Sequence, residues 1–78
     1  MYVILDARKL GEKETAHQYL KTMFSFPDYY GANLDALYDC LTEQPYLCVR
    51  LIHTEDAGAY FEKVLSVFED AENLRICQ

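Results

Sequence analysis

The chain has 78 residues, of which 51% are apolar and 14% aromatic, and its 13 acids outnumber its 7 bases to give a formal charge of −6. A chain this short buries only about 60% of the surface that its unfolded form exposes, so it has room for one domain over residues 1–78. The high apolar content excludes intrinsic disorder, and the length excludes a large enzyme scaffold. We therefore expect one compact domain without a cofactor.

The negative charge is concentrated in the C-terminal part of the chain. Residues 1–24 have a net charge of +1, whereas residues 25–78 have a net charge of −7. Such a field repels nucleic acids and anionic membranes and attracts basic proteins at salt-dependent rates. The charge therefore predicts a basic protein partner, with no binding of nucleic acid or membrane.

The N-terminus and the cysteines both indicate a cytoplasmic protein. The apolar run Tyr2–Leu5 is too short for a signal peptide or a membrane span, and no longer run follows it. Cys40, Cys48 and Cys77 cannot all pair within one chain, and none has the spacing of a redox or zinc motif. We expect three reduced thiols, buried as small apolar side chains.

The first half of the chain predicts a strand followed by a helix. Residues Tyr2–Leu5 are β-prone and wholly apolar, which is typical of a strand covered on both faces. The apolar period of the next segment predicts a helix from residue 12 or 13 to residue 24. Thr15 and Gln18 offer an alternative, because a capping box between them would delay the start of this helix.

The remaining segments continue the alternation of helices and strands. Pro27 and Gly31 mark a loop, and Asn33 is a good N-cap for the helix that follows it. A third helix has Thr54 or Asp56 as its candidate cap. The predicted elements are a loop at 25–32, a helix from 33 to about 42, a strand at 46–52, a helix ending near 72 and a strand at 74–77.

Strands separated by helices require crossover connections and therefore a parallel sheet. The predicted fold class is α/β, a small three-stranded parallel sheet packed by three or four helices. Three apolar helical stripes suffice to cover the faces of so small a sheet and leave no interior volume for a substrate. Function is therefore expected on the surface.

The second predicted helix carries an unbroken acidic row. Asp35, Asp39 and Glu43 are spaced i, i+4, i+8 and share one face, with no base among them. Like charges at this spacing destabilise a helix by a few tenths of a kcal/mol. A row of charges is often only a solvated helix face, and the helix dipole also favours a carboxylate such as Asp35 in the first turn. The dipole does not favour Asp39, which lies beyond that turn.

Tyrosines accompany the acidic row. Tyr29 and Tyr30 precede the helix, and Tyr38 lies between its apolar stripe and its acids. One of the first two is expected to pack in the core and the other to face solvent. Flat aromatic anchors beside carboxylates are typical of an interface for a basic, anion-binding protein.

Catalysis and metal binding fit the sequence less well. Asp35 and Asp39 on an outer helix face would both ionise, whereas an acid and base pair needs unlike environments. His17, His53 and Asp6 lack the spacing of metal ligands, and no glycine-rich phosphate loop is present. We therefore expect no enzyme and no metal, with His17 in the core.

Residues 26–42, FPDYYGANLDALYDCLT, resemble the signature segment of the barstar family, intracellular inhibitors of barnase-type ribonucleases. Weaker agreement extends to the N-terminal strand, to His17 and to residues 64–71. The resemblance implies a barstar-like fold that inhibits a small, basic, secreted ribonuclease in a 1:1 complex, by acidic mimicry of the RNA phosphate. The partner-binding residues that it implies are Tyr29, Asn33, Asp35, Tyr38, Asp39, Thr42, Glu43 and Asp70.

The resemblance also implies individual roles. Asp39 would be the main phosphate mimic, Asp35 would meet a second basic group, and Tyr29 would pack against the catalytic region of the enzyme. Asp70 matches an acidic contact on the last helix of the family.

The chain departs from the family pattern at three places. Tyr38 stands where barstar has Trp, Glu43–Pro45 replaces a turn that carries another Trp, and a shorter segment after the second strand lacks one short helix. These departures leave the target nuclease open. They also leave an alternative, a binding module of barstar fold whose basic partner is not a nuclease.

Overall fold

The computed structural model describes residues 1–77 and contains three strands and three α-helices. Their bounds are β1 Tyr2–Asp6, α1 Lys13–Phe24, α2 Leu34–Thr42, β2 Leu47–Ile52, α3 Ala59–Asp70 and β3 Leu74–Cys77, with 3₁₀ turns at Ala7–Leu10 and Thr54–Asp56. These bounds confirm the α/β class, the extent of the first two helices and the last strand. The capping box at Thr15 is not used, because α1 already begins at Lys13.

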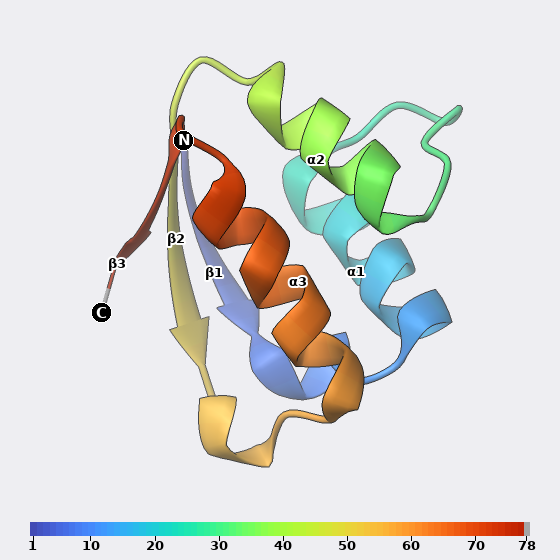
Figure 1. Cartoon of the computed structure of the whole chain (residues 1–78), viewed down its shortest axis with the longest axis vertical. Coiled ribbons are helices and arrows are strands. Elements are labelled where there is room, and N and C mark those ends of the chain that lie inside the picture. The colour runs from blue at the N-terminus through green and yellow to red at the C-terminus, as the bar shows by residue number, and fades with distance from the viewer. Residues whose placement is uncertain (78) are drawn as a thin grey trace.

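The three strands are parallel and lie in the order β1-β2-β3. When successive right-handed crossovers move in one direction across a sheet, their helices pack on the same face. Figure 1 shows α1, α2 and α3 together on one side of the sheet. The expectation that the first strand is covered on both faces is therefore wrong. Val3 and Leu5 are buried, whereas Tyr2 and Ile4 are 56% and 46% exposed.

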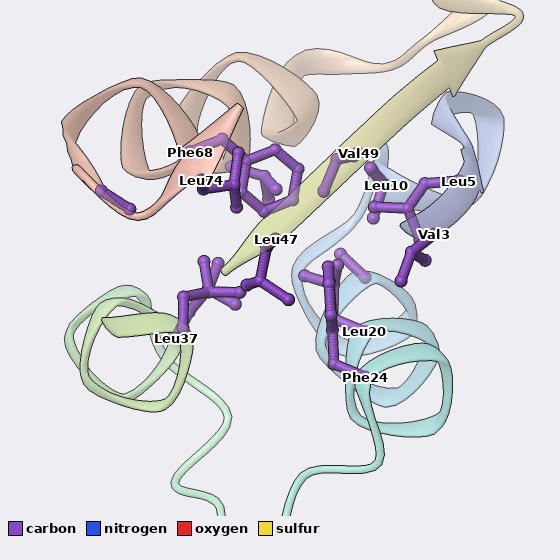
Figure 2. Packing of buried hydrophobic residues seen from close by; sticks show 14 of the residues in the cluster. Val3, Leu5, Leu10, Leu20, Phe24, Leu37, Leu47, Val49, Phe68 and Leu74 are labelled. Carbon is purple, nitrogen blue, oxygen red and sulfur yellow. The ribbon is translucent and has the colours of Figure 1, made fainter. Parts of the chain in front are cut away.

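The core lies between the covered face of the sheet and the three helices. Figure 2 shows side chains from β1, β2 and β3 meeting those of the helices. Phe24 stacks on Phe26 with ring centroids 5.5 Å apart and meets Phe68 edge-on at 6.4 Å. Each fully buried side chain of this size stabilises the fold by about 1.5–3 kcal/mol. The labelled core residues are Val3, Leu5, Leu10, Leu20, Phe24, Leu37, Leu47, Val49, Phe68 and Leu74.

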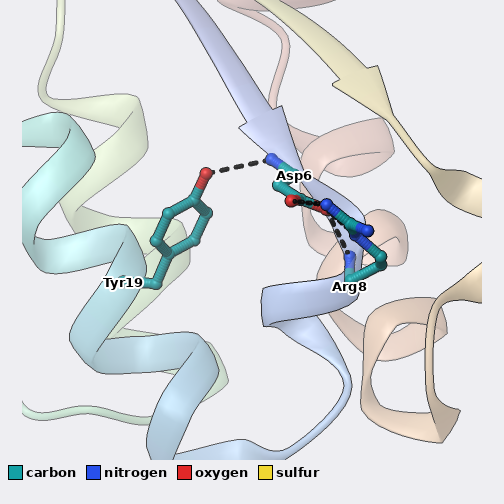
Figure 3. A network of polar contacts seen from close by, with 3 residues as sticks. All are labelled: Asp6, Arg8 and Tyr19. Atoms are coloured by element: carbon teal, nitrogen blue, oxygen red, sulfur yellow. Dashed lines mark hydrogen bonds and ion pairs between the residues drawn. The ribbon is translucent and has the colours of Figure 1, made fainter.

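Polar contacts fasten the end of β1 to α1 (Figure 3). The backbone N–H of Asp6 donates to the hydroxyl of Tyr19 at 2.9 Å. The Asp6 carboxylate accepts from the backbone N–H of Arg8 at 3.0 Å and from its guanidinium at 2.8 Å. Arg8, chiefly through its side-chain hydrogen bond, lowers the pKa of Asp6 to about 2. Asp6 therefore stays ionised and caps the 3₁₀ turn that leaves β1.

The third helix differs from its predicted bounds. Residues Thr54–Asp56 form a separate 3₁₀ turn, and α3 begins at Ala59 after an extended Gly58. A Cβ built on Gly58 would lie 2.9 Å from the Cα of Gly11, so the two backbones touch. The N–H of Tyr60 also donates to the carbonyl of Gly11 at 3.2 Å. This contact between distant segments fixes the start of the helix, which ends at Asp70 because Ala71 is extended.

The cysteines also differ from expectation. Cys48 of β2 and Cys77 of β3 form a disulfide with a Cα–Cα distance of 6.4 Å, and Cys40 alone is a free thiol among the described residues. The two half-cystines are 29 residues apart in sequence, so no short sequence motif predicts this disulfide. The parallel register brings them together, because it pairs Cys48 with Arg75 and Arg50 with Cys77.

Substituting Gly58→Ala is expected to lower the free energy of unfolding by about 1–3 kcal/mol, since the new methyl group would overlap the Gly11 backbone. Chemical denaturation measures the change. Gly31→Ala is the matched control, because a Cβ there meets its nearest side-chain atoms at an ordinary 3.4 Å. Equal stability of the two variants would contradict the close contact of the two glycines.

Candidate partner-binding surface

Helix α2 presents the residues that the sequence analysis singled out. Its N-cap is Asn33, whose side-chain oxygen accepts a hydrogen bond from the backbone N–H of Ala36 at 2.8 Å. Leu37 and Leu41 are fully buried and fix which face of the helix turns inward. The opposite face and the preceding loop form the α2 surface, which consists of Tyr29, Asn33, Asp35, Tyr38, Asp39, Thr42 and Glu43.

The acidic row on the α2 surface is exposed and continuous. Asp35, Asp39 and Glu43 all face solvent. Glu43 is the C-cap but keeps helical dihedral angles, so the i, i+4, i+8 spacing is preserved to the end of the row. Within residues 1–77 the ion pairs join Arg8 to Asp6 and Lys21 to Asp28, and none involves the row. The charge of the α2 surface is therefore available to a partner.

A buried histidine holds the loop that leads into α2. His17 of α1 is 1% exposed, and its Nδ1 and Nε2 each lie 2.6 Å from a hydroxyl, those of Tyr30 and Tyr60 respectively. A neutral imidazole has one donor and one acceptor, so one tyrosine donates to the ring and the other accepts from it. Tyr30 also packs on Phe26 with ring centroids 4.9 Å apart. This network ties the loop to α1 and α3 at once.

The outward placement of one tyrosine follows from the inward placement of its neighbour. Tyr30 is half-buried against the core, whereas Tyr29 is 83% exposed. This confirms the expectation that one of the pair packs and the other faces solvent. Tyr38 is 39% exposed on the margin of α2. Two exposed rings therefore accompany the acidic row, Tyr38 on α2 itself and Tyr29 in the loop that leads into it.

The C-terminal end of α2 is held by a residue that the sequence analysis missed. The Asn73 amide nitrogen donates to the carbonyls of Leu41 and Gln44 at 2.8 and 2.7 Å. The Asn73 carbonyl accepts from the N–H of Leu47, which links the same residue to β2. Orphan carbonyls at a helix end need such partners. No local signal marks Asn73, because its partners lie about 30 positions earlier in the chain.

Two acids, Asp70 and Glu72, lie at the C-terminal end of α3 and just after it. Asp70 is exposed at the last position of α3, which packs against α2. A hollow beside Tyr38 and Thr42 is lined by Glu72 and Asn73 rather than by Asp70. Glu72 is thus the acid that the structure brings next to the C-terminal half of α2.

Two bases lie near the other end of the acidic row. Lys13 and Lys63 line a shallow hollow together with Asp35, although neither forms an ion pair with it in the described part of the chain. The sequence shows no base within the helix itself, but α1 and α3 bring these two to its first turn. The negative potential is therefore least compensated around Asp39 and Glu43.

Outside this surface, His53, Glu55 and Asp56 could offer ligand atoms to a metal, since these atoms lie within 4.8 Å of one another. All three side chains are exposed. The pKa of Arg8 is raised chiefly by its hydrogen bond to Asp6 and further by Asp56 and Glu55, so a cation of the chain already faces this cluster. We assign no metal to it. No helix within residues 1–77 has the length and hydrophobicity of a membrane span.

The stability of the fold is expected to fall as the pH drops below about 6.5, the ordinary pKa of histidine. Burial, with a smaller contribution from Lys13, lowers the pKa of His17, so the unfolded chain takes up the proton more readily than the folded chain. The free energy of unfolding then decreases by up to about 1.4 kcal/mol per pH unit for this one proton. Denaturation between pH 7 and pH 5 measures the slope.

Two variants separate His17 from other titrating groups. His17→Gln keeps a donor and an acceptor between the two tyrosines and is expected to flatten the slope, whatever its stability at pH 7. His53→Gln removes an exposed histidine and is expected to keep the slope of the parent chain. Parallel pH profiles for the parent chain and His17→Gln would assign the dependence elsewhere.

The chain is similar to a known protein family and to a curated bacterial protein. The family model described as "Barstar (barnase inhibitor)" matches residues 1–75, which include the whole α2 surface. A Bacillus subtilis protein named "Putative ribonuclease inhibitor YrdF" is 40% identical over 76 residues, covering 90% of this chain and 84% of that protein.

Proposed function

This chain belongs to the barstar family, and from that premise we propose that it inhibits a small basic ribonuclease of the barnase type by inserting the α2 surface into the RNA-binding cleft. One observation carries the proposal: the exposed acidic row of Asp35, Asp39 and Glu43 forms no ion pair within residues 1–77. Membership in a family of inhibitors also confirms that the chain is not an enzyme.

The acidic row suits a cleft built for phosphates. Arg and Lys bind carboxylates by the same charge-assisted hydrogen bonds that they form with phosphates. Four residues of α-helix advance about 6 Å, so Asp35, Asp39 and Glu43 follow one another at roughly the separation of successive phosphates in a nucleic-acid strand. In this arrangement Asp39, at the centre of the row, is the main phosphate mimic and Asp35 meets a second base.

The α2 surface is fixed before the partner arrives. Asn33 caps the start of the helix, Asn73 holds its last carbonyls, and His17 anchors the loop that carries Tyr29. Side chains and loops that are already ordered lose less conformational entropy on binding. The inhibitor therefore needs no rearrangement of its backbone.

The rest of the contact comes from the tyrosines and the end of α3. A stable interface buries about 800 Å² on each partner, whereas the whole chain exposes 4847 Å². An area of that size needs more than one helix face, so Tyr29, Tyr38 and the acids Asp70 and Glu72 complete it. One α2 surface per chain predicts a 1:1 complex.

Asp39→Ala is expected to weaken binding to barnase by roughly 2–5 kcal/mol, because a base in the cleft is left buried without its partner. The free energy of unfolding should stay the same or rise by a few tenths of a kcal/mol, since two like-charge neighbours lose their repulsion. Titration of the inhibitor into barnase, followed by RNA cleavage, measures the first effect, and denaturation measures the second.

The matched control for this titration is Glu14→Ala, which removes the same charge from the outer side of α1. It should inhibit barnase as the parent chain does. If both variants lost the same amount of binding free energy, the net charge of the chain would explain the loss, and Asp39 would be rejected as the phosphate mimic. Complex formation without any loss of RNA cleavage would reject inhibition in favour of a binding module with another basic partner.

Association is expected to slow by about tenfold or more between low and high salt, while dissociation changes much less. The reason is that the charges of the acidic row act over distance before contact, and the barnase–barstar pair is itself a reference case of such steering. Stopped-flow mixing over a range of ionic strength measures both rates. An association rate that is indifferent to salt would exclude the acidic row as its origin.

A further inference from the structure

The uncovered face of the sheet carries a disulfide in an unusual setting. Cys48 and Arg75 are paired across β2 and β3, and Arg50 is paired with Cys77. Residues two apart on a strand point to the same face, so these four side chains form a square in which cysteine and arginine alternate. Both arginines are exposed, both cysteines are partly exposed, and all three helices lie on the other side of the sheet (Figure 1). We call this set the Cys–Arg square.

The two charged residues of the Cys–Arg square, Arg50 and Arg75, are both positive. In the described chain, neither Arg50 nor Arg75 forms an ion pair, and the neighbours on β1 are the uncharged Tyr2 and Ile4. A cation beside a cysteine favours the thiolate, which is the nucleophile and also the leaving group of thiol–disulfide exchange. Each sulfur of the disulfide has one arginine opposite it and the other along its own strand.

The third cysteine provides a contrast within the same chain. Burial, and then the carboxylates of Glu43 and Asp39, raise the pKa of Cys40. Its thiol is therefore held in the unreactive form, whereas the surroundings of Cys48 and Cys77 favour the reactive one.

A hollow of about 540 Å³ is lined by one of the two half-cystines, Cys77. It lies where β3 has ended and β2 continues to Ile52, and Cys77 and Arg50 are among its lining residues. From α3, Phe61 and Leu65 line the hollow with apolar side chains and Glu69 adds one carboxylate, against the two cations of the square. Its volume is in the range of sites for small molecules. Cys48 does not line this hollow, so approach through it reaches Cys77 first.

From this geometry we propose that Cys48–Cys77 is a site of reversible thiol–disulfide exchange with a small anionic thiol, which enters the hollow, is attracted by Arg50 and reacts at Cys77. This site is separate from the α2 surface and does not depend on the proposed inhibition.

The exchange proceeds in two balanced steps. A thiolate of the small molecule attacks Cys77 Sγ, the disulfide breaks, and its electron pair leaves on Cys48 Sγ as a thiolate beside both arginines. A second thiolate attacks the small-molecule sulfur of the mixed disulfide and releases the Cys77 thiolate. The protein gains two electrons, and the two small thiols lose two as they join in a disulfide. The reverse order, begun by the small-molecule disulfide, oxidises the protein.

Single-thiol variants test which cysteine reacts. In a Cys40→Ala background, Cys48→Ser leaves Cys77 as the only thiol, and Cys77→Ser leaves Cys48. Each is mixed with oxidised glutathione at pH 7, and the mixed disulfide is followed by mass spectrometry. Cys77 is expected to react several-fold faster than Cys48, and Cys40 in a Cys48→Ser/Cys77→Ser variant slowest of the three. Equal rates, or faster reaction of Cys48 or Cys40, would overturn the proposal.

A charge variant tests the role of arginine while the disulfide remains intact. Arg50→Gln is expected to slow reduction of the folded protein by glutathione several-fold, because without this cation the leaving Cys48 thiolate is less stabilised, and a thiol of higher pKa is a poorer leaving group. Lys63→Gln removes the same charge from α3 and should leave the rate unchanged. A rate that Arg50→Gln does not alter, or that both variants lower equally, would reject the square as the reactive site.

Discussion

A three-stranded parallel sheet with the strand order β1-β2-β3 has one face on which right-handed crossover helices can pack, and this constraint shapes the rest of the molecule. The three helices share that face, so their apolar stripes and the inward residues of the strands form one core. The other face is left to solvent with Tyr2, Ile4, Arg50 and Arg75 upon it. The molecule therefore has two unlike surfaces, a helical one and a bare sheet.

Hydrogen bonds from polar side chains fix the position of the α2 surface relative to the core. His17 satisfies both ring nitrogens with tyrosine hydroxyls, one from the loop before α2 and one from α3. The Asn73 amide donates hydrogen bonds to two carbonyls at the C-terminal end of α2. A buried polar group is costly without partners, so each of these contacts specifies one arrangement of the helix rather than several. The acidic row is thus displayed on a rigid support.

The two surfaces carry opposite charge. The acids of α2 and the arginines of the sheet are not paired with each other or with other groups in residues 1–77. Repulsion within the acidic row lowers helix stability slightly, and that stability is recovered from the burial of Leu37 and Leu41 beneath it. Opposite faces keep these charges apart, so the two proposed sites do not overlap.

The differences between expectation and structure share one physical origin. The start of α3 was misplaced because it depends on the contact of Gly58 with Gly11, far away in the chain. The cysteines were expected to be free because their pairing depends on the register of β3 against β2. The first strand was expected to be covered on both faces because its residues are all apolar. Which face the helices cover depends on the strand order, which the sequence of one strand does not contain. Spacing along the chain does not encode contacts of this kind.

The sequence by itself determined the elements and the acidic row, since both follow from local spacing: apolar residues at helical intervals, Asn33 before a helix, and carboxylates four residues apart. The tertiary structure decided which side of the sheet is covered, what holds α2 at its two ends, and which cysteines meet. Those features join residues 13 to 43 positions apart, and only the packed chain brings them within bonding distance.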